Sequence, residues 1–250
     1  MIILWGGKMK HRPRLVFLFF IFLFMWMSVL QTFSMESGFL THPLPENEKA
    51  PVLHLEFLEE EPAKRPIVCF DINSNGFIAI GHSQFEEKTV CVYSPEGLFL
   101  YGFAFQCNGL FELEWNSSYL NLYLARSSLL VCINENAEIL EMAEVDNALQ
   151  NNDYLSHVLQ KETRQTENAE YTVRNRLGFF NLFVSSYSQL VIKPSGGVEK
   201  ILYDVNSQQL AKVLIVFVSF VLIFSILILL VIREIKRREK TKMTCFGQNR

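Results

Sequence analysis

The stretch Thr89–Phe105, TVCVYSPEGLFLYGFAF, decides the fold of this 250-residue chain. It holds two runs of aromatic, aliphatic and β-branched residues, Val90–Tyr93 and Leu98–Phe103, on either side of the tetrapeptide Ser94–Gly97. Proline in that tetrapeptide presets φ for a turn, and the glycine that ends it tolerates positive φ. The stretch therefore predicts an antiparallel β-hairpin.

The same arrangement recurs twice further along the chain. A second hairpin is predicted at Leu129–Met142 around the turn Asn134–Ala137, and a third at Leu190–Tyr203. Cys91 and Cys132, 41 residues apart, hold the same place in the first two hairpins. Such recurrence predicts a fold built from similar β units.

Each hairpin is preceded by a further pair of apolar runs. These are Ile67–Ile72 and Phe77–Gly81 before the first hairpin, Leu110–Trp115 and Leu120–Leu124 before the second, and Tyr171–Arg174 and Phe179–Ser185 before the third. The predicted unit is thus about four strands in roughly 40 residues, a period typical of propeller blades and similar β arrays.

The run FDINSNGFIAIG, from Phe70, together with the hairpin TVCVYSPEGLFLYGF, resembles a blade of the NHL or WD-type β-propeller families. The resemblance covers residues 70–145 well and 171–205 loosely. It implies a mainly β fold of propeller-like four-stranded repeat units over 65–207. No Trp-Asp dipeptide closes a unit, and three units are fewer than a ring needs. A partial propeller, a curved open array and a β-sandwich all remain open, as do unrelated meander hairpins.

Charge is segregated along the chain and excludes one class of partner. From Phe33 to Lys212 there are 24 Asp and Glu against 12 Lys and Arg, whereas the two ends are basic. An acidic middle lacks the basic footprint that nucleic-acid binding requires, so no nucleic-acid partner is expected.

Two apolar segments predict a membrane protein. Val213–Ile232 has 20 uncharged residues, enough to span a bilayer as a helix, so a transmembrane helix is predicted over 211–233. The basic tail 234–250 places the C-terminus in the cytoplasm and the β domain outside. An earlier run, Leu15–Leu30, makes residues 1–34 a signal peptide or a signal anchor. The lipid bilayer is therefore the first expected partner.

Two segments interrupt the β pattern. Residues 35–64 are polar, contain four prolines and are expected to form an exported stalk, with one strand within Val52–Leu58. Residues 146–170 lack Gly and Pro and carry apolar residues near helical spacing, which predicts a helical insertion over about 147–163. As an insertion between repeats it is also a candidate partner-binding face.

No residue is predicted to be catalytic, to bind a cofactor or to bind a metal. Asp71–Gly76 matches the first half of an EF-hand loop, but His82 stands where a bidentate Glu is required and strands flank the loop, so a hairpin turn is expected instead. Glu112 and Glu114 share one face of a predicted strand without forming a recognisable catalytic pair. The chain is not expected to be an enzyme.

Other motifs are equally weak. Cys69, Cys91, Cys107 and Cys132 lie in the exported part with no metal-type spacing, and buried reduced thiols are favoured over disulfides. Asn116-Ser117-Ser118 is a glycosylation sequon. Aromatic residues gather between Phe99 and Trp115, where core packing or a ligand face would each account for them.

These observations predict a protein of the cell membrane with an extracytoplasmic β-repeat domain. Its expected function is that of a binding or sensing module of unknown ligand, with a protein partner or self-association. The alternative is a structural component of a larger envelope or membrane complex that binds no small molecule.

Overall fold

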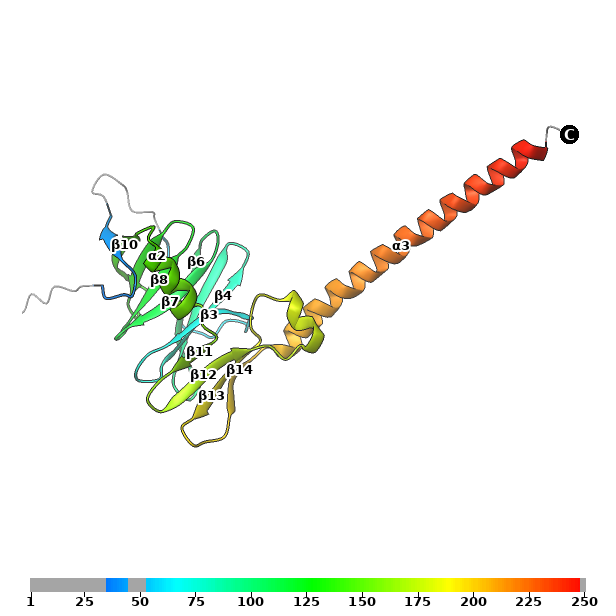
Figure 1. Cartoon of the computed structure of the whole chain (residues 1–250). Coiled ribbons are helices and arrows are strands. Elements are labelled where there is room, and N and C mark those ends of the chain that lie inside the picture. The colour runs from blue at the N-terminus through cyan, green and yellow to red at the C-terminus, as the bar shows by residue number, and fades with distance from the viewer. Residues whose placement is uncertain (1–34, 45–52, 248–250) are drawn as a thin grey trace, which may run out of the picture. The chain divides into compact units, whose positions relative to one another are not determined.

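Strands dominate the computed structural model, which describes residues 35–44 and 53–247 (Figure 1). They form three antiparallel sheets that do not close into a ring. Sheet B, in the order β2-β6-β5-β4-β3, comprises β2 (Glu56–Leu58), β3 (Ile67–Ile72), β4 (Ile78–Gln84), β5 (Glu87–Tyr93) and β6 (Phe99–Gln106). Sheet A, in the order β1-β10-β9-β8-β7, comprises β1 (Thr41–Pro43), β7 (Phe111–Asn116), β8 (Tyr119–Leu124), β9 (Leu129–Ile133) and β10 (Ile139–Val145). Sheet C contains β11 (Thr163–Gln165), β12 (Ala169–Arg174), β13 (Gln189–Pro194) and β14 (Lys200–Asp204), in sequence order.

All three predicted hairpins are present, as β5–β6, β9–β10 and β13–β14. The turns Asn73–Gly76, Ser94–Gly97 and Asn134–Ala137 share one geometry. In each turn, the carbonyl of the first residue accepts a hydrogen bond from the N–H of the fourth residue. The N–H of the first residue donates to the carbonyl of the fifth residue. The fourth residue has positive φ in every case, at 82°, 89° and 60°. This type I turn with a left-handed closing residue sets the register of the hairpin.

Sheet B is the middle layer of a three-layer stack. Side chains at alternate positions of its strands, such as Val90 and Val92, join the core shared with sheet A. Their neighbours Cys91 and Tyr93 point the other way, into the core shared with sheet C. A strand buried on both faces has no polar alternation, which explains why Val90–Tyr93 is wholly apolar.

Where the structure describes the segment 35–64, at 35–44 and 53–64, it pairs with the sheets and does not form a free-standing stalk. Within the described part, β1 pairs with β10 and β2 pairs with β6, each as an added edge strand. Beside the first of these pairings, the His42 ring nitrogens lie 3.2 Å from the Glu144 carboxylate and 2.5 Å from the Asp146 carboxylate. The stalk prediction therefore fails for these residues, because both segments pair with sheets formed far along the chain.

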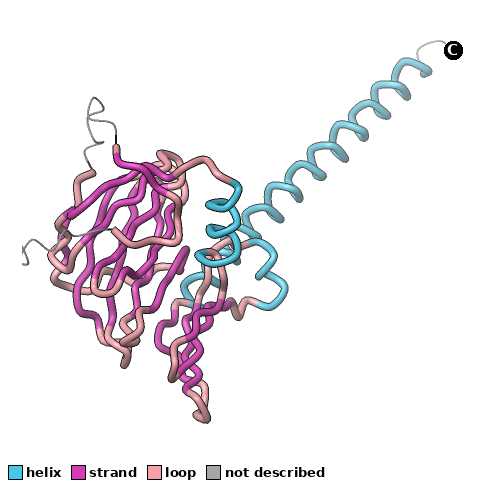
Figure 2. The backbone as a smooth tube through the Cα atoms, turned by 60° about the vertical axis from the view of Figure 1, so that its left-hand side comes forward, coloured by secondary structure: helices cyan, strands magenta, loops and turns pink. Residues whose placement is uncertain are grey.

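The structure places two short helices within the segment predicted to be an insertion. Helix α2 (Leu149–Tyr154) continues into the π-helix η1 (Leu155–Leu159), and both lie against sheet A (Figure 2). Residues 163–165, however, leave the helix and form β11. The helical periodicity of the segment ends there because β12 offers an open edge to pair with.

The strand predicted at Phe179–Ser185 is wrong. Gly178–Phe183 is a 3₁₀ helix, η2, with Gly178 at a φ of 59° and the Asn181 side chain accepting the Leu177 N–H. The fourth strand of sheet C is β11 instead. An aromatic run favours a strand in isolation, but left-handed backbone at Gly178 and an Asn-capped turn break the extended conformation.

The long C-terminal helix α3 (Asn206–Gly247) contains the predicted span. Its part Asn206–Glu234 is long and apolar enough to cross a membrane, and the protein buries none of the most apolar stretch of 18 residues within it. Ser219, one of two polar residues in the uncharged stretch, donates its hydroxyl to the Ile215 carbonyl. That bond satisfies the hydroxyl within the helix itself. The signal peptide or anchor predicted at 1–34 lies outside the described residues.

Candidate binding groove

A groove of about 540 Å³ opens between the turn ends of sheets A and B. Its floor and walls come from the β3–β4 turn, the start of β6, the β7–β8 turn and the β9–β10 turn. The lining residues are Asn73, Ser74, Asn75, Phe77, Val92, Leu100, Tyr101, Trp115, Ser117, Ser118 and Glu135. The volume lies within the range of small-molecule sites. We call it the A–B groove.

Three partly buried aromatic rings line the A–B groove. Phe77, Tyr101 and Trp115 come from different strands or turns and each is neither fully buried nor fully exposed. The Trp115 indole N–H donates to the Asp71 carbonyl at 3.3 Å, which anchors the ring. The Tyr101 ring stacks on Phe57 at a centroid distance of 6.4 Å. Rings held in this way offer flat apolar surface at little entropic cost.

The polar lining is uncharged except for one carboxylate. Ser74, Asn75, Ser117 and Ser118 are exposed amides and hydroxyls, and Glu135 is the single ionisable acid among the lining residues. Burial, and then the nearby Glu135 charge, raise the pKa of Tyr101 to about 12, so its hydroxyl stays protonated. The groove therefore suits uncharged or cationic groups and disfavours anions.

Asp71, the first residue of the EF-hand-like motif, does not face this groove as a metal ligand. Its carboxylate accepts the Trp115 backbone N–H at 2.7 Å and pairs with the Arg164 guanidinium at 3.0 Å, both side chains being 13% exposed. Burial raises its pKa, and these two contacts offset only part of that effect. Asn73 likewise uses its side-chain oxygen to hold the turn. Over the described ranges, no group of three or more His, Cys, Asp or Glu side chains could hold a metal ion.

Glu112 and Glu114 lie together on the outer face of β7, beneath the insertion. Glu114 accepts hydrogen bonds from Tyr154 and from Ser37 and Gly38 of the segment before β1. Gln160 donates to Glu112 at 3.3 Å. Burial raises the pKa of Glu112 to about 7. All of these contacts are made with other residues of the same chain. The two glutamates therefore hold the insertion and the segment near Ser37 against sheet A.

Cysteines and the sequon take structural positions. Cys69, Cys91 and Cys132 are buried and Cys107 is partly buried, and all four are free thiols. Burial raises the pKa of Cys132 to about 11, as expected for an inert core thiol. Asn116, the sequon acceptor, ends β7 and is only 9% exposed, so a glycan there would require the sheet end to open.

The aromatic cluster from Phe99 to Trp115 divides between core and groove. Phe103, Phe105 and Phe111 are buried between sheets A and B, whereas Tyr101 and Trp115 reach the groove. The sequence did not decide which of these aromatic residues are buried. Alternation along a strand predicts two faces but does not say which face is exposed to solvent. Glu135 and the serine turn carry no signal that could have pointed to the groove.

No protein-family model, no curated protein and no solved structure matches this chain. The resemblance to propeller blades therefore stays a prediction.

Proposed function

We propose that this chain is a membrane-anchored recognition module whose A–B groove binds an uncharged or cationic ligand with an apolar face. The observation that carries the proposal is the set of three rings around a lining with a single charge, Glu135. Exposed aromatic surface beside convergent polar groups is typical of binding sites. The Tyr101 hydroxyl is placed to donate a hydrogen bond to such a ligand.

In this proposal the helix α3 anchors the module in the cell membrane. The 20 uncharged residues Val213–Ile232 match the bilayer core, and basic residues follow from Arg233 onward. The excess of Lys and Arg after the span supports a cytoplasmic tail and an extracytoplasmic β domain. The three sheets are proposed to be propeller-like blades stacked in an open array, with β1 and β2 as additional edge strands of sheets A and B.

The ligand class is tested on the full chain in nanodiscs with three defined probes. These are a neutral hexasaccharide, a tetralysine peptide with one terminal tryptophan, and the matching tetraglutamate peptide. We expect saturable binding of the neutral or the cationic probe and rejection of the anionic one. Tyr101→Phe, which keeps the ring, should weaken the bound probe about fivefold, the effect of one lost hydrogen bond.

The charge of the groove is tested separately by Glu135→Gln. This change should weaken the lysine peptide more than the saccharide, since only the peptide carries positive charge. Glu170→Gln, on an exposed residue of sheet C outside the groove, is the matched control. Preference for the glutamate peptide, absence of binding by the other two probes, or equal affinity of all variants would contradict the proposal.

A structural function is the second candidate, and one exposed ring favours it. Phe85, at the β4–β5 turn, is 93% exposed and has a φ of 56°. The buried Lys88 holds this turn by donating to the Phe85 carbonyl and the Ser83 hydroxyl, both at 2.6 Å. A rigidly presented aromatic side chain suits insertion into a partner protein. If Phe85→Ser lowers the mass of a complex isolated in nanodiscs while probe binding is absent, the structural function is favoured.

A further inference from the structure

The 3₁₀ helix η2 presents apolar side chains beside the start of α3. Phe179 and Leu182 are 69% and 80% exposed. They sit in the connection between β12 and β13, on a turn that is held in shape by Asn181. Large apolar groups at adjacent exposed positions of one turn call for an apolar surrounding.

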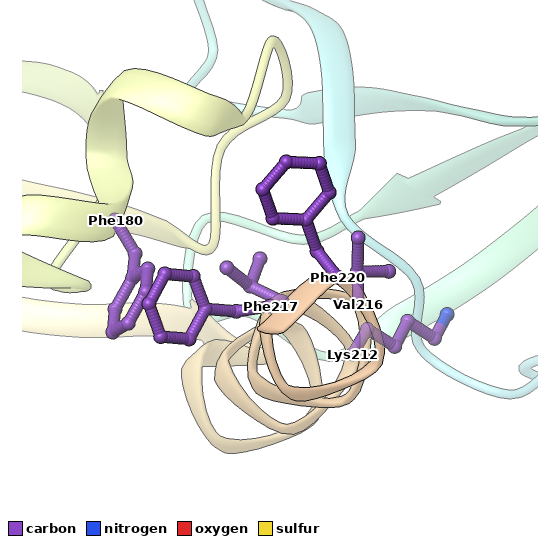
Figure 3. Close-up of a pocket in the computed structure, with 6 residues that line it drawn as sticks. Phe180, Lys212, Val216, Phe217 and Phe220 are labelled. Carbon is purple, nitrogen blue, oxygen red and sulfur yellow. The ribbon is translucent and has the colours of Figure 1, made fainter. Parts of the chain in front are cut away.

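Phe180 of the same turn packs against α3. Its ring meets the Phe217 ring edge-to-face at 5.6 Å (Figure 3). Together they border a pocket of about 440 Å³. The lining residues are Phe180, Lys212, Val213, Val216, Phe217 and Phe220. All but Lys212 are apolar, and Figure 3 shows the Lys212 side chain extending away from the two rings.

The position of this pocket along α3 sets its depth in a bilayer. The uncharged stretch begins at Val213, and Phe217 lies four residues further on, which is about 6 Å along a helix. If Val213–Ile232 fills the hydrocarbon core, the pocket lies in its outermost layer. Aromatic residues concentrate at this depth in membrane proteins.

The two segments that carry η2 and the span differ in charge from the rest of the domain. Residues 175–187 and 205–232 contain two charged side chains, Arg176 and Lys212, and both are basic. The domain as a whole is acidic. A basic residue near a lipid surface contributes about 1 kcal/mol of attraction to anionic headgroups. A lysine that borders an apolar span, as Lys212 does, can extend its amino group toward the headgroups.

We propose that η2 inserts into the leaflet on the side of the β domain, that one phospholipid acyl chain fills the pocket at Phe180 and Phe217, and that Lys212 meets the lipid phosphate. The inference rests on the anchoring by α3 proposed above. It adds a second membrane contact, which would hold the β domain at the bilayer surface.

Insertion is tested with tryptophan reporters in liposomes of phosphatidylcholine brominated on the acyl chain. Phe179→Trp and Leu182→Trp report on η2, Val198→Trp on the 88% exposed β13–β14 turn, and Phe224→Trp on the middle of the span. Wild-type emission is subtracted, because the chain already contains 3 tryptophans.

We expect bromines near the carbonyl end to quench the added emission of both η2 reporters at least about twofold, in keeping with burial about 5–10 Å into the interface. Val198→Trp should not be quenched. Quenching at Phe224 alone overturns the inference and leaves the anchor standing. No quenching at any reporter overturns both. A blue-shifted η2 reporter that bromolipid fails to quench places the turn against protein, such as a second copy, and overturns the lipid as its occupant.

The acyl-chain site is tested by filling it. Val216→Trp adds bulk inside the pocket, and Leu229→Trp introduces a tryptophan elsewhere on α3, outside the pocket lining. Native mass spectrometry of the full chain released from nanodiscs should show several-fold less retained phospholipid for Val216→Trp than for Leu229→Trp. Equal retention by the two variants would overturn the acyl-chain site.

Discussion

At the scale of single residues, backbone conformation explains the recurring turns. Gly76, Gly97 and Ala137 all close a turn of the same geometry with positive φ. Glycine reaches this region freely, whereas an alanine there pays roughly 1–2 kcal/mol. The turn of the second hairpin nevertheless forms with alanine in this conformation. Additional hydrogen bonds hold it, since the Asn134 side-chain oxygen accepts the N–H groups of Asn136 and Glu138.

Ala137→Gly should accordingly stabilise the protein. Relief of the left-handed strain outweighs the larger entropy of glycine in the unfolded chain, and we expect a gain of roughly 0.5 kcal/mol. The measurement is the urea midpoint of the full chain in detergent micelles, followed by circular dichroism.

Gly97→Ala is the reciprocal change at the equivalent position. The added methyl group would meet Leu202 at an ordinary 3.5 Å, so only the backbone penalty changes. It should lose about 1 kcal/mol. Opposite signs for the two variants support a shared turn geometry, and a loss of stability in both would refute it.

Two buried titratable residues act in opposite directions on stability. Burial lowers the pKa of His82 from 6.5 to about 4, against a hydrogen bond to the Pro66 carbonyl. As the pH falls from 6.5 to 4, the unfolded chain takes up a proton that the folded chain refuses, so His82 destabilises the fold by up to about 3 kcal/mol. Burial raises the pKa of Glu112 from 4.5 to about 7. As the pH rises from 4.5 to 7, the unfolded chain loses a proton that the folded chain keeps, so Glu112 destabilises the fold over this range.

We predict that replacing one of these two residues reveals the effect of the other on the pH dependence of stability. Glu112→Gln should lose more stability than wild type on acidification from pH 6.5 to 4.5, because Glu112 no longer offsets the contribution of His82. His82→Asn should lose stability as the pH rises from 4.5 to 7. Urea midpoints of the full chain across this pH range provide the measurement, with wild type lying between the two. Parallel curves for all three proteins would show that neither group is buried as described.

At the scale of elements, the segment 146–170 connects all three sheets. Its helical part lies on sheet A, its strand β11 pairs with β12 of sheet C, and Arg164 binds Asp71 of β3 in sheet B. Arg164 also donates to the Leu159 and Phe70 carbonyls and lies over the Phe70 ring. The segment is therefore structural, and deletion of Asn147–Glu170 is expected to unfold the domain.

A sharper test of this junction is Arg164→Met. Removing one partner leaves the Asp71 carboxylate buried without its counter-charge, which we expect to cost about 3–5 kcal/mol. The control Arg174→Met breaks a half-exposed pair with Glu199 and should cost at most about 1 kcal/mol. Urea unfolding of the full chain measures both. Adding Asp71→Asn to Arg164→Met should cost less than the two changes summed, because they share one interaction. Strict additivity would contradict the pairing.

Close packing at one glycine ties sheets A and B together. A Cβ atom on Gly81 of β4 would lie 2.4 Å from the Cys69 sulfur and 2.8 Å from the Phe111 ring. Gly81→Ala forces both apart and should destabilise the fold by about 1–3 kcal/mol. Gly81→Ala combined with Cys69→Ala should recover part of that loss in the same unfolding measurement. No recovery would place the conflict at Phe111 alone.

At the scale of the whole molecule, the orientation in the membrane is the central prediction. Val198→Cys, on an exposed turn, should react with a membrane-impermeant maleimide in intact cells, in a background where Cys107 is serine. Cys245, after the span, should react only once the membrane is permeabilised. The reason is the excess of basic residues that follows Ile232. The reverse labelling pattern would invert the proposed topology.

The sequence by itself determined the hairpins and the candidate membrane-spanning stretch through local residue preferences. The hairpins at Val90, Leu129 and Leu190 follow from strand propensity around turn residues, and the span follows from twenty uncharged residues. These features depend on φ preferences, side-chain alternation and hydropathy, each of which acts over a few neighbouring residues.

Only the tertiary structure decided how these elements combine. The pairing of β1 and β2 as edge strands, the choice of β11 over residues 179–185, and the Arg164–Asp71 contact across 93 residues all depend on which edges and charges remain unpaired after the hairpins form. The A–B groove arises in the same way, since its rings come from strands that meet only when sheets A and B stack. Pairing between distant segments depends on the shapes of the surfaces that meet, which cannot be read from short stretches of sequence. For this reason the sequence predicted the hairpins but not the A–B groove.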